Sequence, residues 1–123
     1  MSTNQHVVVL GASPKPNRFS NKTIKLLTQH GHCVTPVHPK FNEIESLKVA
    51  NKLTDIQPPI DTLTLYVGPQ RLLPMIDEII ASNPGRVIFN PGTESPELQN
   101  SLDDANIPWQ EACTLVLLNT GRF

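Results

Sequence analysis

The stretch His6-Val7-Val8-Val9-Leu10-Gly11 decides the fold. A continuous apolar run that stops at a glycine is typical of a parallel strand buried on both faces. A loop with two prolines follows over residues 12–17, and apolar spacing then predicts a helix over residues 20–30, with Gly31 just past its end. Strand, loop and helix in that order predict the first βα unit of a parallel sheet.

The same alternation continues along the chain. Further strands are predicted over residues 33–37, 62–67, 86–89 and 107–111, and further helices over residues 70–82, 95–105 and 113–119. Residues 40–57 are too sparse in apolar positions to fix a period, and we expect a short strand near 47–49 and a helical turn near 52–56. The pattern predicts a Rossmann-like α/β fold, a doubly wound and mostly parallel sheet of about five strands in three α/β/α layers, with residues 1–123 as a single domain.

Composition excludes several classes of protein. No apolar run approaches the roughly 20 residues of a membrane helix, and the first residues lack the pattern of a signal peptide, so we expect a soluble, cytoplasmic protein without a membrane partner. Cys33 and Cys113 are too few for a disulfide framework, and the segment 30–33 has too few ligands for a metal, so we expect reduced thiols and no metal site. Aromatic and basic residues do not interleave as in nucleic-acid binders. Monomer and homodimer both stay open.

Charge is distributed unevenly along the chain. Residues 1–52 hold seven Lys or Arg and two carboxylates, whereas residues 53–123 hold three Arg and nine carboxylates. Arg18 and Lys40 flank the ends of two predicted strands. This asymmetry favours an anionic ligand held by the first third of the chain.

Ligands of open α/β sheets bind outside the carboxyl ends of the strands, so the residues that follow each predicted strand are the candidates. The candidate ligand-binding residues are Gly11, Ala12, Ser13, Arg18, Ser20, Asn21, His38, Pro39, Lys40, Val67, Gly68, Pro69, Asn90, Pro91 and Gly92.

The first of these loops lacks the glycine pattern of a dinucleotide site. Of the three glycines of G-x-G-x-x-G only Gly11 is present, with Ser13 and Pro16 at the other two positions, and the Gly-Lys-Ser/Thr ending of a phosphate loop is also missing. What remains is a helix N-terminus with polar side chains and Arg18, which is suited to binding an anion. The alternative is that Ser20 merely caps the helix and Arg18 is solvated.

The end of the second strand indicates the kind of anion. An NAD site places Asp or Glu about 20 residues beyond the glycines to hold a free ribose. Here the sequence is His38-Pro39-Lys40, which suits a ribose that carries an additional phosphate. Coenzyme A or NADP is therefore favoured over NAD.

Three blocks carry a resemblance to a known family: Gly11-Ala12-Ser13-Pro14, the run from Asn17 to Lys22, and Val34-x-Pro36-Val37-x-Pro39. They resemble the small stand-alone CoA-binding proteins, which are similar to the nucleotide-binding domain of the succinyl-CoA synthetase α subunit. Weaker similarity continues as far as residues 111–115.

The resemblance implies a fold that binds the ADP end of coenzyme A or of an acyl-CoA. Residues 11–13 would meet the pyrophosphate, Arg18 and Lys40 the phosphates, and Pro39 with residues 67–69 the adenosine. At Asn90-Pro91-Gly92 many relatives carry a bulkier polar segment. The phosphorylated histidine of the synthetases belongs to a later domain, so ligase activity does not carry over.

We therefore expect a CoA-binding protein that does not itself catalyse a reaction. Two enzyme hypotheses compete with this expectation. Cys113 follows the last predicted strand at a predicted helix start, where a thiolate is stabilised, and could handle an acyl thioester or form a disulfide with CoA. The other alternative is an NADP-binding, reductase-like protein.

Overall fold

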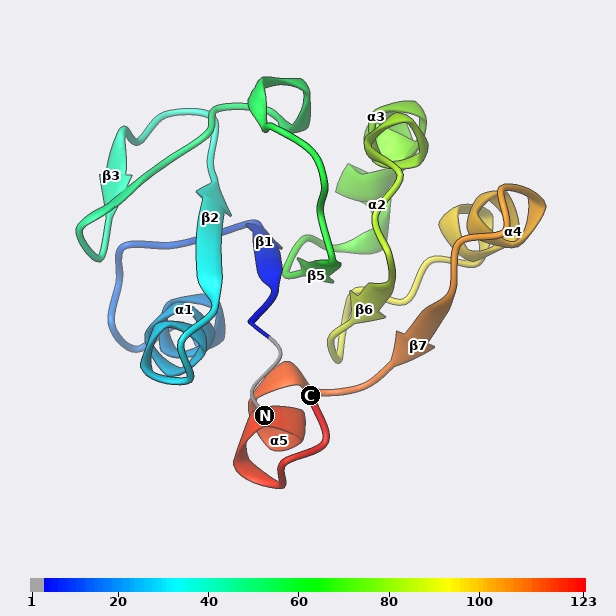
Figure 1. Cartoon of the computed structure of the whole chain (residues 1–123). Helices are drawn as coiled ribbons and strands as arrows, with labels where there is room; N and C mark the ends of the chain where they lie inside the picture. The colour runs from blue at the N-terminus through cyan, green and yellow to red at the C-terminus, as the bar shows by residue number, and fades with distance from the viewer. Residues whose placement is uncertain (1–3) are drawn as a thin grey trace.

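A computed structural model describes residues 4–123. Its centre is a five-stranded, fully parallel sheet with the strand order β2-β1-β5-β6-β7. The Rossmann-like α/β fold predicted from the sequence is confirmed (Figure 1). The strands of this sheet are β1 (His6–Leu10), β2 (Cys33–Val37), β5 (Thr62–Leu65), β6 (Val87–Phe89) and β7 (Trp109–Glu111).

β1 is an interior strand of the sheet and is covered on both faces, which explains its uninterrupted apolar run. Val7 and Val9 belong to one hydrophobic cluster, whereas Val8 and Leu10 belong to the cluster on the opposite face. All four side chains are at most 2% exposed. Because both faces of the strand exclude water, no position in it can be polar without a partner.

Helices cover both faces of the sheet (Figure 1). α1 and α5 lie on one face and contribute Ile24, Leu27 and Leu118 to its core, while α2, α3 and α4 lie on the other. The helices are α1 (Phe19–Gln29), α2 (Pro69–Leu72), α3 (Ile76–Ser82), α4 (Pro96–Asp104) and α5 (Thr114–Asn119), and short 3-10 turns span Leu53–Asp55 and Leu73–Met75.

The single helix predicted over residues 70–82 is wrong. α2 ends at Leu72, a 3-10 turn containing Pro74 follows, and α3 begins at Ile76. Proline has no N–H to donate and its ring collides with the preceding turn, so a regular helix cannot run through Pro74. The apolar spacing survives the break because Leu72 and Ile79 still pack into the same core.

The segment that the sequence left least defined forms an antiparallel hairpin of β3 (Glu43–Ile44) and β4 (Leu47–Lys48), followed by the 3-10 turn at Leu53–Asp55. The strand expected near residues 47–49 and the turn expected near 52–56 are both present. The hairpin lies beside β2 at the edge of the sheet, where Ala50 bridges to Val37. Edge position also explains how Pro36 fits within β2, since proline has no N–H to donate and an edge strand needs donors toward one neighbour only.

Candidate ligand-binding site

The β1–α1 loop leads directly into a helix N-terminus without a side-chain cap. α1 begins at Phe19 with Arg18 as the N-cap residue, and no side chain accepts a hydrogen bond from its first turn, which holds no acidic residue. Ser20 is the second residue of the helix rather than its cap, so the alternative that Ser20 caps α1 is wrong. The first-turn N–H groups and the helix dipole therefore stay available to an anion.

A pocket of about 890 Å³ opens at this helix end, outside the carboxyl ends of β1, β2 and β5. β1 pairs with β2 on one side and with β5 on the other, so the strand order reverses here. Pockets of about 300–1,000 Å³ accommodate small-molecule ligands, and this reversal is where open α/β sheets bind them.

The charged side chains that line the pocket are all positive. Its lining includes five cationic side chains and no carboxylate. Basic groups on four separate segments thus surround one cavity, which favours a ligand with several negative charges. The cations are Lys15, Arg18, Lys40, Lys52 and Arg71.

The end of β2 supplies an aromatic and basic wall. The His38 ring contacts the Phe41 ring, with the ring centroids 4.5 Å apart, and both side chains line the pocket. His38 Nδ1 accepts a hydrogen bond of 3.0 Å from the Lys40 backbone N–H, which leaves the proton of the neutral ring on Nε2. Burial, followed by the charges of Lys40 and Arg71, lowers the pKa of His38 below its usual 6.5.

We expect the imidazole titration of His38, followed by NMR, to give a pKa below 6.5, and the Arg71→Gln variant to raise it because one repelling charge is removed. The matched control is Lys22→Gln on the exposed surface of α1, outside the pocket lining. A His38 pKa unchanged by Arg71→Gln would contradict the placement of that guanidinium beside the ring.

Tyr66 directly follows β5 and lines the pocket. Its hydroxyl is hydrogen-bonded to Thr23 Oγ1 of α1, and burial raises the pKa of Tyr66 to about 12. The phenol therefore stays protonated at neutral pH. It can donate a hydrogen bond to Thr23, but it cannot serve as a base.

The structure brings most candidates from the sequence together and separates the rest. Those that line the pocket are Gly11, Ala12, Ser13, Arg18, Ser20, His38, Pro39, Lys40 and Val67. Those outside its lining are Asn21, Gly68, Pro69, Asn90, Pro91 and Gly92.

Asn90 is a buried hub between strands rather than a pocket residue. Its Nδ2 donates to Thr64 Oγ1 and to the Leu65 carbonyl, both at 2.7 Å, and its Oδ1 accepts from the Thr114 N–H at 2.9 Å. These bonds use the polar atoms of its 2% exposed side chain within the fold. Asn90 thereby ties the end of β6 to β5 and to the start of α5.

Several pocket residues were not among the candidates from the sequence. Lys52 follows the hairpin in the segment without a readable period, and Arg71 lies in the first turns of the helix after β5. Lys15 and Phe41 are each one or two residues from a candidate. Extending every strand end by one helical turn would have found Arg71, because β5 adjoins β1 at the reversal of the sheet.

Cys113 lies outside the pocket lining. It is the N-cap residue of α5, a helix of six residues, and its side chain is half-buried. Among residues 4–123, no three His, Cys, Asp or Glu side chains gather in a way that could hold a metal ion. Within the same range, no helix has the length and apolar character needed to cross a bilayer.

Comparison with known proteins identifies the family. Residues 5–119 match the family described as CoA binding domain. The chain belongs to the CoA binding domain family. The family resemblance read from the glycine loop and the end of β2 is confirmed by this match.

Solved structures of similar proteins share the whole fold. A crystal structure of an uncharacterized protein is 38% identical, with a TM-score of 0.92 over 99% of this chain and 100% of that chain. A Thermus thermophilus structure, cell-free ID.343, is 29% identical with a TM-score of 0.89, over 98% of this chain and 91% of that chain. The uncharacterized protein YneT of Bacillus subtilis is 24% identical over 83 residues, which span 68% of this chain and 62% of YneT.

A larger protein contains the same fold as one part. The dinucleotide forming acetyl-coenzyme A synthetase 1 of Ca. Korarchaeum cryptofilum matches 89% of this chain with a TM-score of 0.76, but at 18% identity and over 26% of its own length. At this identity the likeness concerns the fold alone. It shows that this α/β unit also occurs as a component of a multi-part enzyme.

Proposed function

We propose that the protein binds coenzyme A or an acyl-CoA through its phosphorylated ADP end, in the pocket at the carboxyl ends of β1, β2 and β5. One observation carries the proposal: five cations and no carboxylate line a pocket that also contains an uncapped helix N-terminus. Backbone N–H groups and the helix dipole suit a pyrophosphate, and the surrounding cations suit a further phosphate. Membership of the CoA binding domain family supports the same ligand.

The arrangement suggests how the ligand is divided among the walls. The pyrophosphate would lie against Ser13 and the first turn of α1, beside Arg18. The adenosine would lie against the His38–Phe41 wall, which brings the 3′-phosphate near Lys40. Binding without a chemical step accounts for all of these contacts.

Titration calorimetry with four ligands tests the proposal. CoA is expected to bind more tightly than dephospho-CoA and NAD, because both of these lack the additional ribose phosphate. NADP reports on the reductase alternative, since it carries an additional phosphate without the pantetheine arm. Absence of CoA binding at millimolar concentration, or tighter binding of NAD than of CoA, would refute the proposal.

Lys40→Gln is expected to weaken CoA binding roughly tenfold and to leave dephospho-CoA binding unchanged. A hydrogen bond to a charged group contributes about 1.5–3 kcal/mol, and exposure of Lys40 to solvent places the effect at the lower end. The matched control is Lys48→Gln on β4, which removes a nearby exposed lysine outside the pocket lining. Equal weakening of both ligands by Lys40→Gln would assign Lys40 to the pyrophosphate instead.

A further inference from the structure

The β1–α1 loop presents its backbone to the pocket with little help from glycine. Pro14 and Pro16 have no N–H to offer, so the remaining N–H groups of the loop must point correctly. A carbonyl oxygen turned into an anion site would repel the ligand, and Ser13 is one of the residues that line this site. A hydrogen bond from outside the loop can hold that carbonyl away from the pocket.

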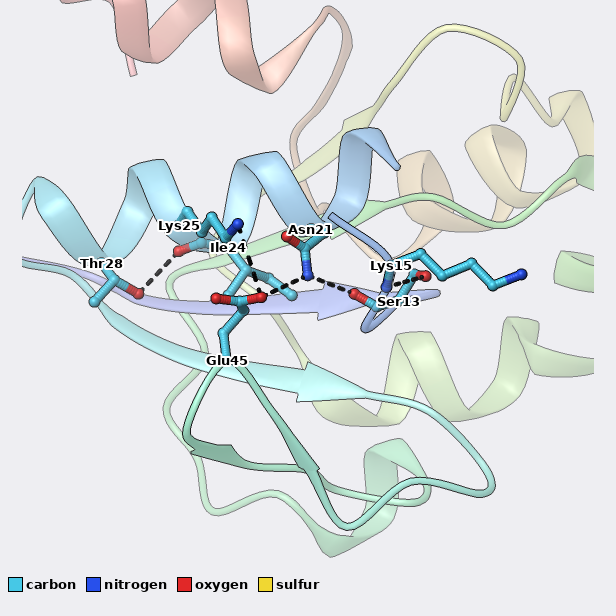
Figure 2. A network of polar contacts seen from close by, with 7 residues as sticks. All are labelled: Ser13, Lys15, Asn21, Ile24, Lys25, Thr28 and Glu45. Carbon is cyan, nitrogen blue, oxygen red and sulfur yellow. Dashed lines mark hydrogen bonds and ion pairs between the residues drawn. The ribbon is translucent and has the colours of Figure 1, made fainter. Parts of the chain in front are cut away.

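Asn21, in the first turn of α1, makes such a hydrogen bond. Its Nδ2 donates a 2.9 Å hydrogen bond to the Ser13 carbonyl and a 3.0 Å hydrogen bond to Glu45 Oε2, as Figure 2 shows. The side chain is fully buried, and its Oδ1 makes no hydrogen bond to the described residues. Asn21 therefore works as a donor placed between two acceptors.

Glu45 reaches this position from the hairpin, 24 residues away in sequence. It sits at the tip between β3 and β4 in a left-handed conformation, with φ of 52°, and Ser46 follows with φ of 64°. Lys25 Nζ lies 4.0 Å from the Glu45 carboxylate on the exposed side. The carboxylate thus faces α1 and the loop rather than the pocket, whose lining excludes it.

We propose that Asn21 and Glu45 are positioning residues for ligand binding, because together they lock the Ser13 carbonyl and hence the conformation of the loop that faces the phosphates. This inference rests on the proposed function for the identity of the ligand. The hydrogen bonds from Asn21 to Ser13 and Glu45 do not depend on that identity. The β3–β4 hairpin thus contributes to the site through Glu45. Glu45 influences the ligand only through its hydrogen bond with Asn21.

Asn21→Asp is the decisive variant because it keeps the shape and removes both donors. The new carboxylate would face the Ser13 carbonyl and Glu45, so CoA binding measured by calorimetry is expected to weaken at least tenfold. Glu45→Ala is expected to weaken it less, since the Ser13 bond remains. Glu45→Gln keeps an acceptor oxygen and is expected to bind CoA as the wild type does.

Two controls separate positioning from general loss of stability. Ser95→Ala removes the side-chain cap of α4, in which Ser95 Oγ accepts from the Leu98 N–H, and lowers Tm at a place away from the pocket. It is expected to leave CoA affinity unchanged. Lys25→Gln removes only the exposed ion pair with Glu45 and is also expected to leave CoA affinity unchanged. Wild-type affinity in folded Asn21→Asp would overturn the proposal.

Hydrogen exchange in the ligand-free protein tests whether Asn21 and Glu45 hold the loop, even if CoA does not bind. The amides of Ser13, Lys15, Asn17 and Arg18 are expected to exchange faster in Asn21→Asp and Glu45→Ala than in the wild type, and at the wild-type rate in Glu45→Gln. Failure of the wild type to bind CoA would refute the proposed function only. Unchanged exchange of this loop in both Asn21→Asp and Glu45→Ala would refute the positioning role of Asn21 and Glu45 only.

Discussion

Gly11→Ala is expected to destabilise the protein by about 2–4 kcal/mol and to abolish ligand binding in the fraction that stays folded. Gly11 has φ of +88°, a conformation that alanine adopts only with strain. An added Cβ would also lie 2.7 Å from both the Tyr66 carbonyl oxygen and Val67 Cγ2. The carbonyl cannot retreat easily, because the Tyr66 N–H is bonded to the Leu10 carbonyl and fixes the end of β5.

Urea unfolding measures this loss, and Gly121→Ala is the matched control. Gly121 also has a positive φ, of +70°, but nothing lies within 4 Å of the Cβ position. It should show only the conformational cost, about 1 kcal/mol. Equal losses in the two variants would mean that the close approach at Gly11 contributes nothing.

Asn90→Leu is expected to cost about 3–5 kcal/mol. A leucine of similar size would leave the Leu65 carbonyl and the Thr114 N–H without their partner in a buried place, and each unsatisfied group costs about 1–3 kcal/mol. Thr64 loses one bond but keeps its contact with Thr114 Oγ1 at 2.8 Å. The loss therefore comes mainly from the two backbone groups.

The same variant distinguishes a structural Asn90 from one that binds ligand. Protein that remains folded should keep its CoA affinity, because Asn90 lies outside the pocket lining. Glu94→Ala is the control in the same loop; it removes an exposed acceptor of the Gly92 N–H and should change stability by less than about 0.5 kcal/mol. Loss of affinity without loss of stability in Asn90→Leu would place Asn90 at the ligand after all.

The sequence predicts the fold well where burial in the tertiary structure leaves a local pattern of apolar residues. β1 needed apolar residues on both faces, and that requirement is visible as an unbroken run from Val7 to Leu10. Candidates placed at the strand ends of the first two loops line one pocket, since every parallel strand delivers its carboxyl end to the same edge. The cations Arg18 and Lys40 were found in this way.

Two candidates, Asn21 and Asn90, lie outside the pocket lining because of contacts that have no sequence period. Asn21 and Asn90 were sensible candidates by position, but their amides are used by Ser13, Glu45, Leu65 and Thr114, which are 8 to 25 residues away. Hydrogen bonds over such separations leave no mark on local spacing. The helix break at Pro74 has a different cause. A proline inside a helical pattern is itself a local signal for a break, but the apolar spacing continues on both sides of Pro74 and favoured a single helix.

The proline in β2 and the bridge from Ala50 to Val37 have a consequence for self-association. An open strand edge offers its backbone to other chains and promotes aggregation, and proline or a covering segment blunts it. Along the β2 side of the sheet both devices are present, since the Ala50 N–H also bonds the Pro36 carbonyl. At the opposite side, β7 has three residues, too short an edge to template a stable intermolecular sheet. The two edges of the five-stranded sheet therefore disfavour pairing of two copies through an extended sheet.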